Sequence, residues 1–236
     1  MIYKNFAYIY DSLMYEFSYS DIYKFLLDKF PKSNKVLEIG CGTGELISKL
    51  VKNFDVVGLD SSADMLSIAR EKLNPDVKLL NLDMRNLIKI DNFDLVISTC
   101  DSISYMLTED DLLKVFKGVF ENLNINGYFV FDVNSKYKFL NMENTYVDEI
   151  NDVFYIWENF YDISTDINLY SVNFFVKNKG ESYTRYYEEH KQRAYEDEVI
   201  KKLLKSVGFK EVESYNGYTD EKVRKDTERI VYIARR

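Results

Sequence analysis

The chain has 236 residues, of which 46% are hydrophobic and 30% charged, and its formal net charge is −8. This size and balance predict one large soluble domain, or one domain with an insertion. The negative charge argues against a nucleic-acid partner, because nonspecific binding to phosphates rests on clustered Lys and Arg. No apolar run approaches the roughly 18 residues of a membrane span. Residues 1–5 lack the apolar core of a signal peptide, so we expect a cytoplasmic protein without membrane association.

The two cysteines, Cys41 and Cys100, fit neither a zinc-ligand spacing nor a disulfide framework. No metal site is therefore predicted. Two interpretations of the thiols stay open at this point. They are small residues that line a tight site, or they form a redox switch.

After a segment rich in Tyr and Phe, an amphipathic helix is predicted from Asp21 to Phe30. Short apolar runs then alternate with helical patterns. Strands are predicted at residues 35–39, 55–60, 77–82, 93–99 and 128–133, and helices at residues 45–53, 63–73 and 109–123. This alternation is typical of a parallel sheet that is covered by helices on both faces.

Residues 146–195 break this rhythm. Three long, aromatic and largely alternating segments are predicted as strands, at residues 153–161, 167–177 and 182–195. They indicate an inserted antiparallel unit of about three strands. The α/β pattern then resumes, with a helix at residues 197–207 and strands at residues 209–215 and 229–234.

A glycine-rich loop joins the first predicted strand to the helix that follows. Its glycines, Gly40, Gly42 and Gly44, allow a tight turn and a close approach to a ligand. The spacing is G-x-G-x-G, whereas a dinucleotide site expects G-x-G-x-x-G. Glu38 precedes the loop, and its carboxylate disfavours a pyrophosphate but suits the ammonium and sulfonium groups of S-adenosylmethionine. The charge pattern therefore favours this methyl donor over NAD, with Cys41 lining the site.

Acidic residues end the next strands, at the sheet edge where open α/β folds bind ligands. Asp60 can accept hydrogen bonds from ribose hydroxyls. Asp83 can accept one from an adenine amino group, while Met84 packs on the ring. Cys100 and Asp101 end the fourth strand, where the donor and the methyl acceptor would meet.

On these motifs the sequence resembles the class I S-adenosylmethionine-dependent methyltransferases. Residues 36–44 match the first motif of that superfamily, and residues 58–66 match the second, which adds Ser61 and Met65 to the expected cofactor contacts. Residues 83–85 and 93–98 match the third and fourth. The resemblance implies a Rossmann-like sheet in the order 3-2-1-4-5-7-6, with the last strand antiparallel and an antiparallel β unit inserted.

A narrower resemblance to the sugar-amine and glycine N-methyltransferases lies outside that core, in residues 6–11 and in the insert. It implies that an N-terminal tyrosine covers the cofactor and that the insert roofs the acceptor site. Tyr10 and Tyr19 are the candidates for that tyrosine. The implied division is a cofactor-binding domain of residues 1–145 and 196–236, with residues 1–30 as an N-terminal cap, and a lid of residues 146–195.

The insert also carries candidates for the chemistry. His190 is the only histidine, and its titration near neutral pH makes it a candidate base. Glu158 shares a predicted strand face with apolar residues, which is unexpected for a carboxylate without a partner. With Tyr10, these two are the predicted catalytic residues. In an alternative role, the carboxylates of Glu158, Glu188 and Asp101 would attract a cationic amine.

The predicted function is methyl transfer from S-adenosylmethionine to nitrogen or oxygen of a small-molecule acceptor, with S-adenosylhomocysteine as product. Three alternatives stay open: a nucleic-acid or protein methyltransferase, an NAD-linked oxidoreductase, and a non-catalytic cofactor-binding module of the same fold. A monomer and a homodimer are both compatible with the sequence.

Overall fold

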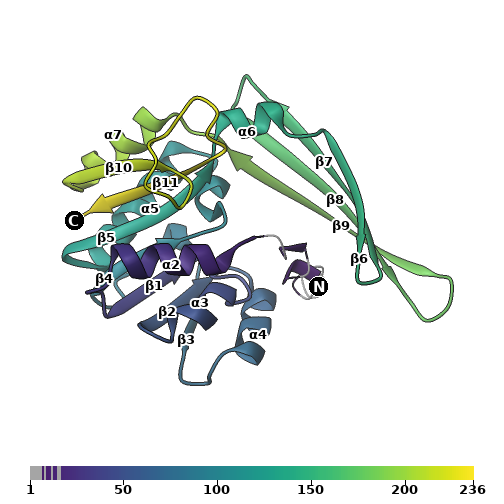
Figure 1. The fold of residues 1–236 in the computed structure, drawn as a ribbon, viewed down its shortest axis with the longest axis horizontal. Coiled ribbons are helices and arrows are strands. Elements are labelled where there is room, and N and C mark those ends of the chain that lie inside the picture. Colours follow the sequence, from purple (N-terminus) through teal and green to yellow (C-terminus); the bar gives the residue numbers. More distant parts are fainter. Residues whose placement is uncertain (1–6, 8, 12, 15–16) are drawn as a thin grey trace.

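A computed structural model describes residues 7, 9–11, 13–14 and 17–236 (Figure 1). Among the described residues, seven strands form one sheet in the order β10-β11-β5-β4-β1-β2-β3. These strands are β1 (Lys35–Ile39), β2 (Asp55–Asp60), β3 (Lys78–Asn81), β4 (Phe93–Ser98), β5 (Leu123–Asn134), β10 (Glu211–Asn216) and β11 (Arg229–Arg235). β11 runs antiparallel to β5, while β1 pairs in parallel with both β2 and β4. The predicted strand order and the antiparallel last strand are confirmed.

The strands of this sheet are apolar on both faces because helices cover both. On one face, Leu37 and Phe131 belong to a core that includes residues of α5 and α7; on the other, Val36 and Val130 pack with residues of α2, α3 and α4 (Figure 1). These helices are α2 (Tyr19–Lys29), α3 (Glu45–Leu50), α4 (Ala63–Lys72), α5 (Glu109–Asn122) and α7 (Asp197–Val207). Ser18, Ser62 and Thr108 begin α2, α4 and α5 by accepting a hydrogen bond from a backbone N–H of the first turn.

The insert is a separate antiparallel sheet that projects from the main body in Figure 1. It follows α6 (Lys136–Asn141), and its strands in spatial order are β6 (Thr145–Ile150), β7 (Val153–Asp162), β8 (Ile167–Lys177) and β9 (Tyr183–Arg193). The sequence predicted about three strands, and the structure adds β6. β6 is an edge strand whose residues are exposed or half-buried, so it lacks the apolar alternation that marks the other three.

The hairpin between β6 and β7 is closed by Asn151 and Asp152, which both have a positive φ, of 49° and 62°. Two such residues form the tight turn whose twist matches that of the flanking strands. The cross-strand register then decides which side chains share a face. Asn159, Tyr170 and His190 lie opposite one another across β7, β8 and β9.

One face of the insert, which we call the inner face, packs toward the main body. Tyr170, Val172 and Phe174 of this face form an apolar cluster with Ile9 of the N-terminal segment, and Met65 of α4 packs against the same cluster. These contacts hold the inner face against the N-terminal segment and α4.

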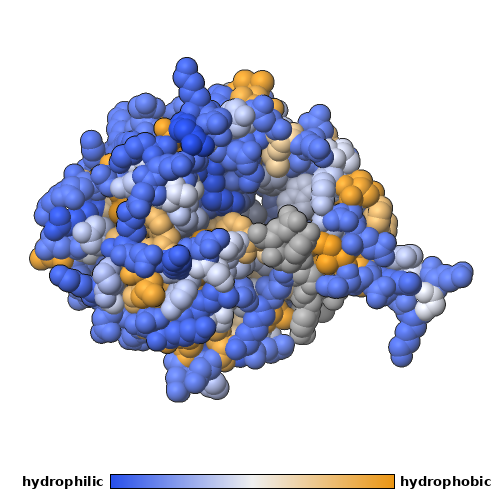
Figure 2. Space-filling model, in the orientation of Figure 1, coloured by the Kyte–Doolittle hydropathy of each residue, from blue (hydrophilic) through white to orange (hydrophobic). Residues whose placement is uncertain are grey.

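No helix among the described residues is long and apolar enough to span a membrane. The face of the molecule in Figure 2 is mostly hydrophilic, with apolar side chains in small separate patches. Within the same described residues, no group of three or more His, Cys, Asp and Glu side chains is arranged to hold a metal ion.

Candidate functional site

The loop after β1 has the tight backbone that its glycines predicted. Gly40, Gly42 and Gly44 have φ values of 73°, 52° and 75°, a region that side chains with a Cβ rarely adopt. A Cβ on Gly40 would also lie 2.8 Å from Oγ of Ser102. The loop therefore needs glycine at this position for its backbone and for its close contact with the segment after β4.

Glu38 is a buried carboxylate at this loop, only 2% exposed. Its Oε1 accepts a long hydrogen bond of 3.5 Å from Thr99 Oγ1, and its Oε2 has no hydrogen-bond partner in the part of the chain that the structure describes. Burial raises the pKa of Glu38 to about 8. A buried acid without a compensating donor is unfavourable unless a ligand supplies one.

Asp60 ties the end of β2 to the loop. Its Oδ2 accepts a hydrogen bond of 2.8 Å from the Gly42 N–H, and its Oδ1 accepts one of the same length from the Ser62 N–H. Burial nevertheless raises the pKa of Asp60 above its usual value. Each oxygen keeps a second lone pair for a ligand. Ser61 is exposed, and its carbonyl accepts a hydrogen bond from Asn81.

Asp83 and Met84 lie beyond β3, beside the loop. Asp83 begins the short helix η1 (Met84–Asn86) and forms an ion pair with Arg85, which lowers the pKa of the acid. The terminal carbon of Met84 would lie 3.3 Å from a Cβ on Gly40. The structure thus brings this predicted pair to the glycine loop, with the Asp83 carboxylate already paired.

Cys100 and Asp101 follow β4 in a strained backbone, with positive φ values of 55° and 52°. The Asp101 carboxylate accepts hydrogen bonds from Arg229 of β11 and from Gln192 of the insert, at 2.9 Å and 2.5 Å. Arg229 also pairs with Asp132 of β5. Asp101 therefore joins three parts of the chain, and sequence reasoning missed Arg229 and Gln192 because each is one polar residue on a strand.

The N-terminal tyrosines reach the same edge of the sheet. The Cys100 thiol donates to the Tyr19 hydroxyl at 3.6 Å, and Tyr10 is hydrogen-bonded to Tyr19. Burial raises the pKa of both phenols, so both stay protonated. Phe6 and Tyr8, which carried part of the narrower resemblance, lie outside the described residues.

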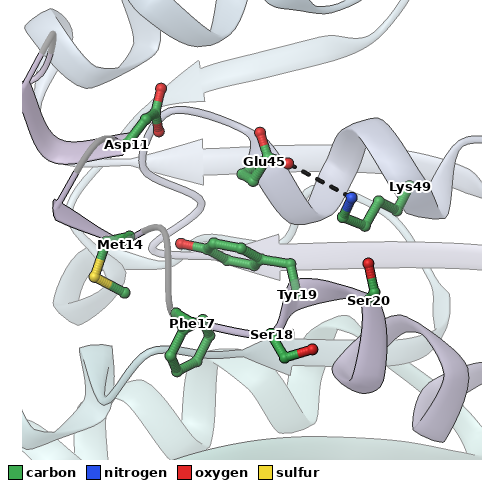
Figure 3. A pocket seen from close by; sticks show the side chains of 8 residues that line it. All are labelled: Asp11, Met14, Phe17, Ser18, Tyr19, Ser20, Glu45 and Lys49. Atoms are coloured by element: carbon green, nitrogen blue, oxygen red, sulfur yellow. Dashed lines mark ion pairs between the residues drawn. The ribbon is translucent and has the colours of Figure 1, made fainter. Parts of the chain in front are cut away.

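Asp11, the last residue of the N-terminal stretch that resembles the sugar-amine and glycine N-methyltransferases, holds this segment on the loop. Its carboxylate accepts a hydrogen bond from Thr43 Oγ1 at 2.5 Å and pairs with Lys72 of α4. A cavity of about 490 Å³ opens beside the segment, and in Figure 3 the Tyr19 ring extends into it from the start of α2. It is lined by Asp11, Met14, Phe17, Ser18, Tyr19, Ser20, Glu45 and Lys49.

His190 and Glu158 do not lie together. His190 is on the inner face, with its ring edge-on to Tyr105 at 6.0 Å between centroids; Tyr105 ends the short helix η2 (Ser102–Tyr105) that follows β4. Glu158 pairs with Ser171 and, across β8, with Glu189, so it belongs to the opposite face. The sequence predicted the alternation of the strand that carries Glu158, but it did not predict which face of the insert meets the main body. We therefore withdraw Glu158 as a catalytic candidate.

The arginines of the insert make local contacts. Arg185 donates to Asn173 Oδ1 on the neighbouring strand, and Arg193 donates to the carbonyl of Leu107. Arg193 also stacks over the Tyr195 ring at 4.8 Å. Both contacts support the sheet and its attachment.

The two thiols are free, and burial raises the pKa of each above its usual value. A thiolate is the reactive form, so both thiols should react slowly in the folded protein. We expect iodoacetamide to label Cys41 and Cys100 only after unfolding, and to label both fully when the folded protein is treated with mild peroxide before it is unfolded. Mass spectrometry measures both. Loss of labelling after peroxide would support the redox switch instead.

Comparisons with known proteins agree with this geometry. Residues 36–127 match a family described as a methyltransferase domain. YqeM of Bacillus subtilis (strain 168), which carries a provisional methyltransferase name, is 35% identical over all of this chain and 98% of its own length. The crystal structure of an S-adenosylmethionine-dependent methyltransferase from Clostridium acetobutylicum is also 35% identical, covers 99% of this chain and 98% of its own, and superposes with a TM-score of 0.88.

The chain belongs to the class I S-adenosylmethionine-dependent methyltransferases. A more distant relative is the dTDP-3-amino-3,4,6-trideoxy-alpha-D-glucopyranose N,N-dimethyltransferase of Streptomyces venezuelae. It is 34% identical over 112 residues, which are 47% of this chain and 47% of that protein. The match to this sugar-amine enzyme covers about half of each chain.

The cofactor of this methyltransferase is S-adenosylmethionine. The residues present fit it. The orphaned Glu38 oxygen offers an acceptor to a cation, and the loop from Gly40 to Gly44 lets a ligand approach the backbone. An NAD pyrophosphate would instead lie beside the acidic groups of Glu38 and Asp60, whose ionised forms repel it.

Proposed function

We propose that this methyltransferase moves a methyl group to nitrogen or oxygen of a small molecule that binds between the inner face of the insert and the end of β4. The observation that carries the proposal is the position of His190 beside Tyr105, four residues past Asp101. The named activity of the Streptomyces venezuelae relative, which acts on an amino sugar, supports a small acceptor. Residues 146–195 are then an acceptor lid on a domain of residues 1–145 and 196–236.

The residues around the loop would hold the donor. Glu38 would accept from the amino group of the methionine end, and Asp60 from the ribose hydroxyls. Cys41, Met65, Asp83 and Met84 would line the remainder. When bound, S-adenosylmethionine supplies a methyl group already activated on a sulfonium, so the protein chiefly aligns the acceptor and moves its proton.

Tyr10 and Tyr19 would cover the reacting end. Both phenols are protonated and nearly enclosed, so they exclude water and can donate a hydrogen bond. Asp101, held by Arg229 and Gln192, fixes the shape of the segment after β4. His190 would accept the acceptor proton. The free thiols fit a reducing compartment, and we propose the cytoplasm.

A test of the donor uses thermal unfolding. S-adenosylmethionine and S-adenosylhomocysteine should raise the melting temperature, and NAD should not, because a ligand bound only by the folded state stabilises it. Turnover is then measured over a panel of amines, sugars and acids. If neither S-adenosylmethionine nor S-adenosylhomocysteine raises the melting temperature, the proposed function is wrong.

Replacing His190 with glutamine should lower kcat by about 100-fold for a panel acceptor, as expected when a positioned proton acceptor is lost. The matched control is Lys191→Gln, because Lys191 is the exposed neighbour on the opposite face. Donor binding should not change in either variant. A His190→Gln rate equal to that of the control excludes the proton-acceptor role.

Replacing Asp60 with alanine should weaken binding of S-adenosylhomocysteine by about 1–3 kcal/mol through the lost hydrogen bonds. Calorimetry measures the affinity. Asp55→Ala, at the exposed start of the same strand, serves as the control and should bind as the wild type does. Equal affinities for the two variants would show that the ribose lies elsewhere.

A further inference from the structure

Glu188 is a second buried carboxylate, on the inner face of the insert. It is 6% exposed, and among the described residues neither of its oxygens has a hydrogen-bond partner. Its near neighbour is His190, whose Nε2 lies 3.1 Å from Glu188 Oε2. An ionised carboxylate in such a place is costly unless a partner neutralises it.

The described residues offer Glu188 no fixed cation. In the described parts of the insert and of the strands beside it, Lys136, Lys177 and Arg229 form ion pairs with acids other than Glu188. On its own strand, Arg185 and Lys191 fall on the opposite face by the strand alternation. The insert thus presents a negative charge toward the main body beside a single imidazole.

Aromatic rings share the inner face with Glu188. Trp157 shares the face of Glu188, with Val172 between them in the register, and stands edge-on to Tyr170 at 5.6 Å. Tyr105 from the main body meets His190. A surface that carries both a carboxylate and aromatic rings suits an organic cation, since ring faces also attract positive charge.

The side chains of Glu188 and His190 together favour one chemical class of methyl acceptor. An alkyl hydroxyl is far too weak an acid to give its proton to an imidazole, whereas an ammonium ion is closer in acidity to imidazolium. An acceptor carboxylate would be repelled by Glu188. Of amines, hydroxyls and carboxylates, only an amine, as its ammonium ion, can both pair with a carboxylate and give a proton to an imidazole.

We infer that the methyl acceptor is a primary or secondary amine that enters as its ammonium ion and is bound by Glu188. This rests on the proposed function and narrows it from nitrogen or oxygen to nitrogen. The ammonium gives one proton to His190 Nε2, and the imidazolium so formed pairs with Glu188. The freed nitrogen lone pair forms the N–C bond to the methyl group while the S–C bond breaks and leaves its electron pair on sulfur.

The single histidine of the chain makes this testable without knowledge of the natural acceptor. In protein labelled at histidine and saturated with S-adenosylhomocysteine, the one imidazole signal in the NMR spectrum reports on His190. It is titrated with cyclohexylamine and, separately, with cyclohexanol, which has the same skeleton but no charge. Cyclohexylamine should shift the signal saturably, and cyclohexanol should not.

Two variants sharpen the result. Glu188→Gln keeps the shape and removes the charge, and it should weaken cyclohexylamine binding at least about tenfold, or roughly 1.4 kcal/mol. Glu189→Gln removes an equal charge from the exposed opposite face and should leave binding unchanged. Thermal stabilisation by S-adenosylhomocysteine checks that each variant is folded.

An equal response to cyclohexanol, no response to cyclohexylamine, or unchanged amine binding in Glu188→Gln overturns the inference. If Glu188→Gln does not fold, the two titrations of the wild type still decide it. Failure of the proposed function has a different appearance, because S-adenosylhomocysteine would then give no thermal stabilisation at all.

Discussion

Glu38→Gln is expected to stabilise the ligand-free protein at pH 8 and, in the same variant, to weaken S-adenosylmethionine binding by about 3 kcal/mol, roughly 100-fold. The gain in stability and the loss of binding both come from removing the same buried acidic group. Ligand-free Glu38 is a buried acid with one unpartnered oxygen, and it becomes favourable only when a cation arrives. Glutamine removes both the penalty and the attraction.

The pH dependence follows from the pKa of about 8 in the folded protein, against an ordinary value of 4.5. Between these values the folded state holds a proton that the unfolded state has lost. Stability from this group is therefore complete below about pH 4.5 and is lost as the pH rises toward 8. The wild type should lose about 2–4 kcal/mol over this range relative to Glu38→Gln.

Chemical denaturation of ligand-free protein at pH 5 and pH 8 measures the stability difference, and calorimetry measures the binding. Glu121→Gln, an exposed acid of α5, is the control and should change neither. Weakened binding without the pH-dependent stability difference would mean that Glu38 is already satisfied in the ligand-free protein. Unchanged binding would remove Glu38 from the cofactor site.

Arg229→Met is expected to destabilise the protein by about 3–5 kcal/mol. Arg229 pairs with the half-buried Asp101 and the fully buried Asp132, and its removal leaves both acids without that cation. The Arg229 side chain also stacks over Phe17 of the N-terminal segment at 5.2 Å. The lost charge should therefore loosen the cap over the site as well as the sheet.

The control lies on the same strand. Arg235 pairs with Glu211 at the surface, and such exposed pairs contribute about 0–1 kcal/mol, so Arg235→Met should have a small effect. Urea unfolding compares the two variants. Adding Asp132→Asn to Arg229→Met should restore part of the loss, because one of the orphaned charges is removed. Equal midpoints for Arg229→Met and Arg235→Met are incompatible with a structural role for this network.

The strands of the main sheet could be predicted because each of them has a local pattern, whereas their order was implied by the resemblance to the class I methyltransferases. Apolar runs of five or six residues are expected where both faces of a parallel strand are covered, and the structure has them at β1, β2 and β4. β6 escaped prediction because an exposed edge strand needs no such pattern. Its pairing with β7, not its own sequence, makes it a strand.

The sequence by itself determined the glycine loop and the acids at the strand ends. The backbone conformation at Gly40 and the charge that Glu38 offers a ligand depend on residue type and on near neighbours in the sequence. Only the tertiary structure decided which face of the insert meets the main body. Strand alternation and register place Glu158 and Glu188 on opposite faces of the insert, but they do not tell which face meets the main body. Ile9 and Met65 pack against the face that carries Glu188, and this packing decides it. The ion pairs of Arg229 and the contact of Asp11 with Thr43 join residues far apart in the chain, so no local pattern records them.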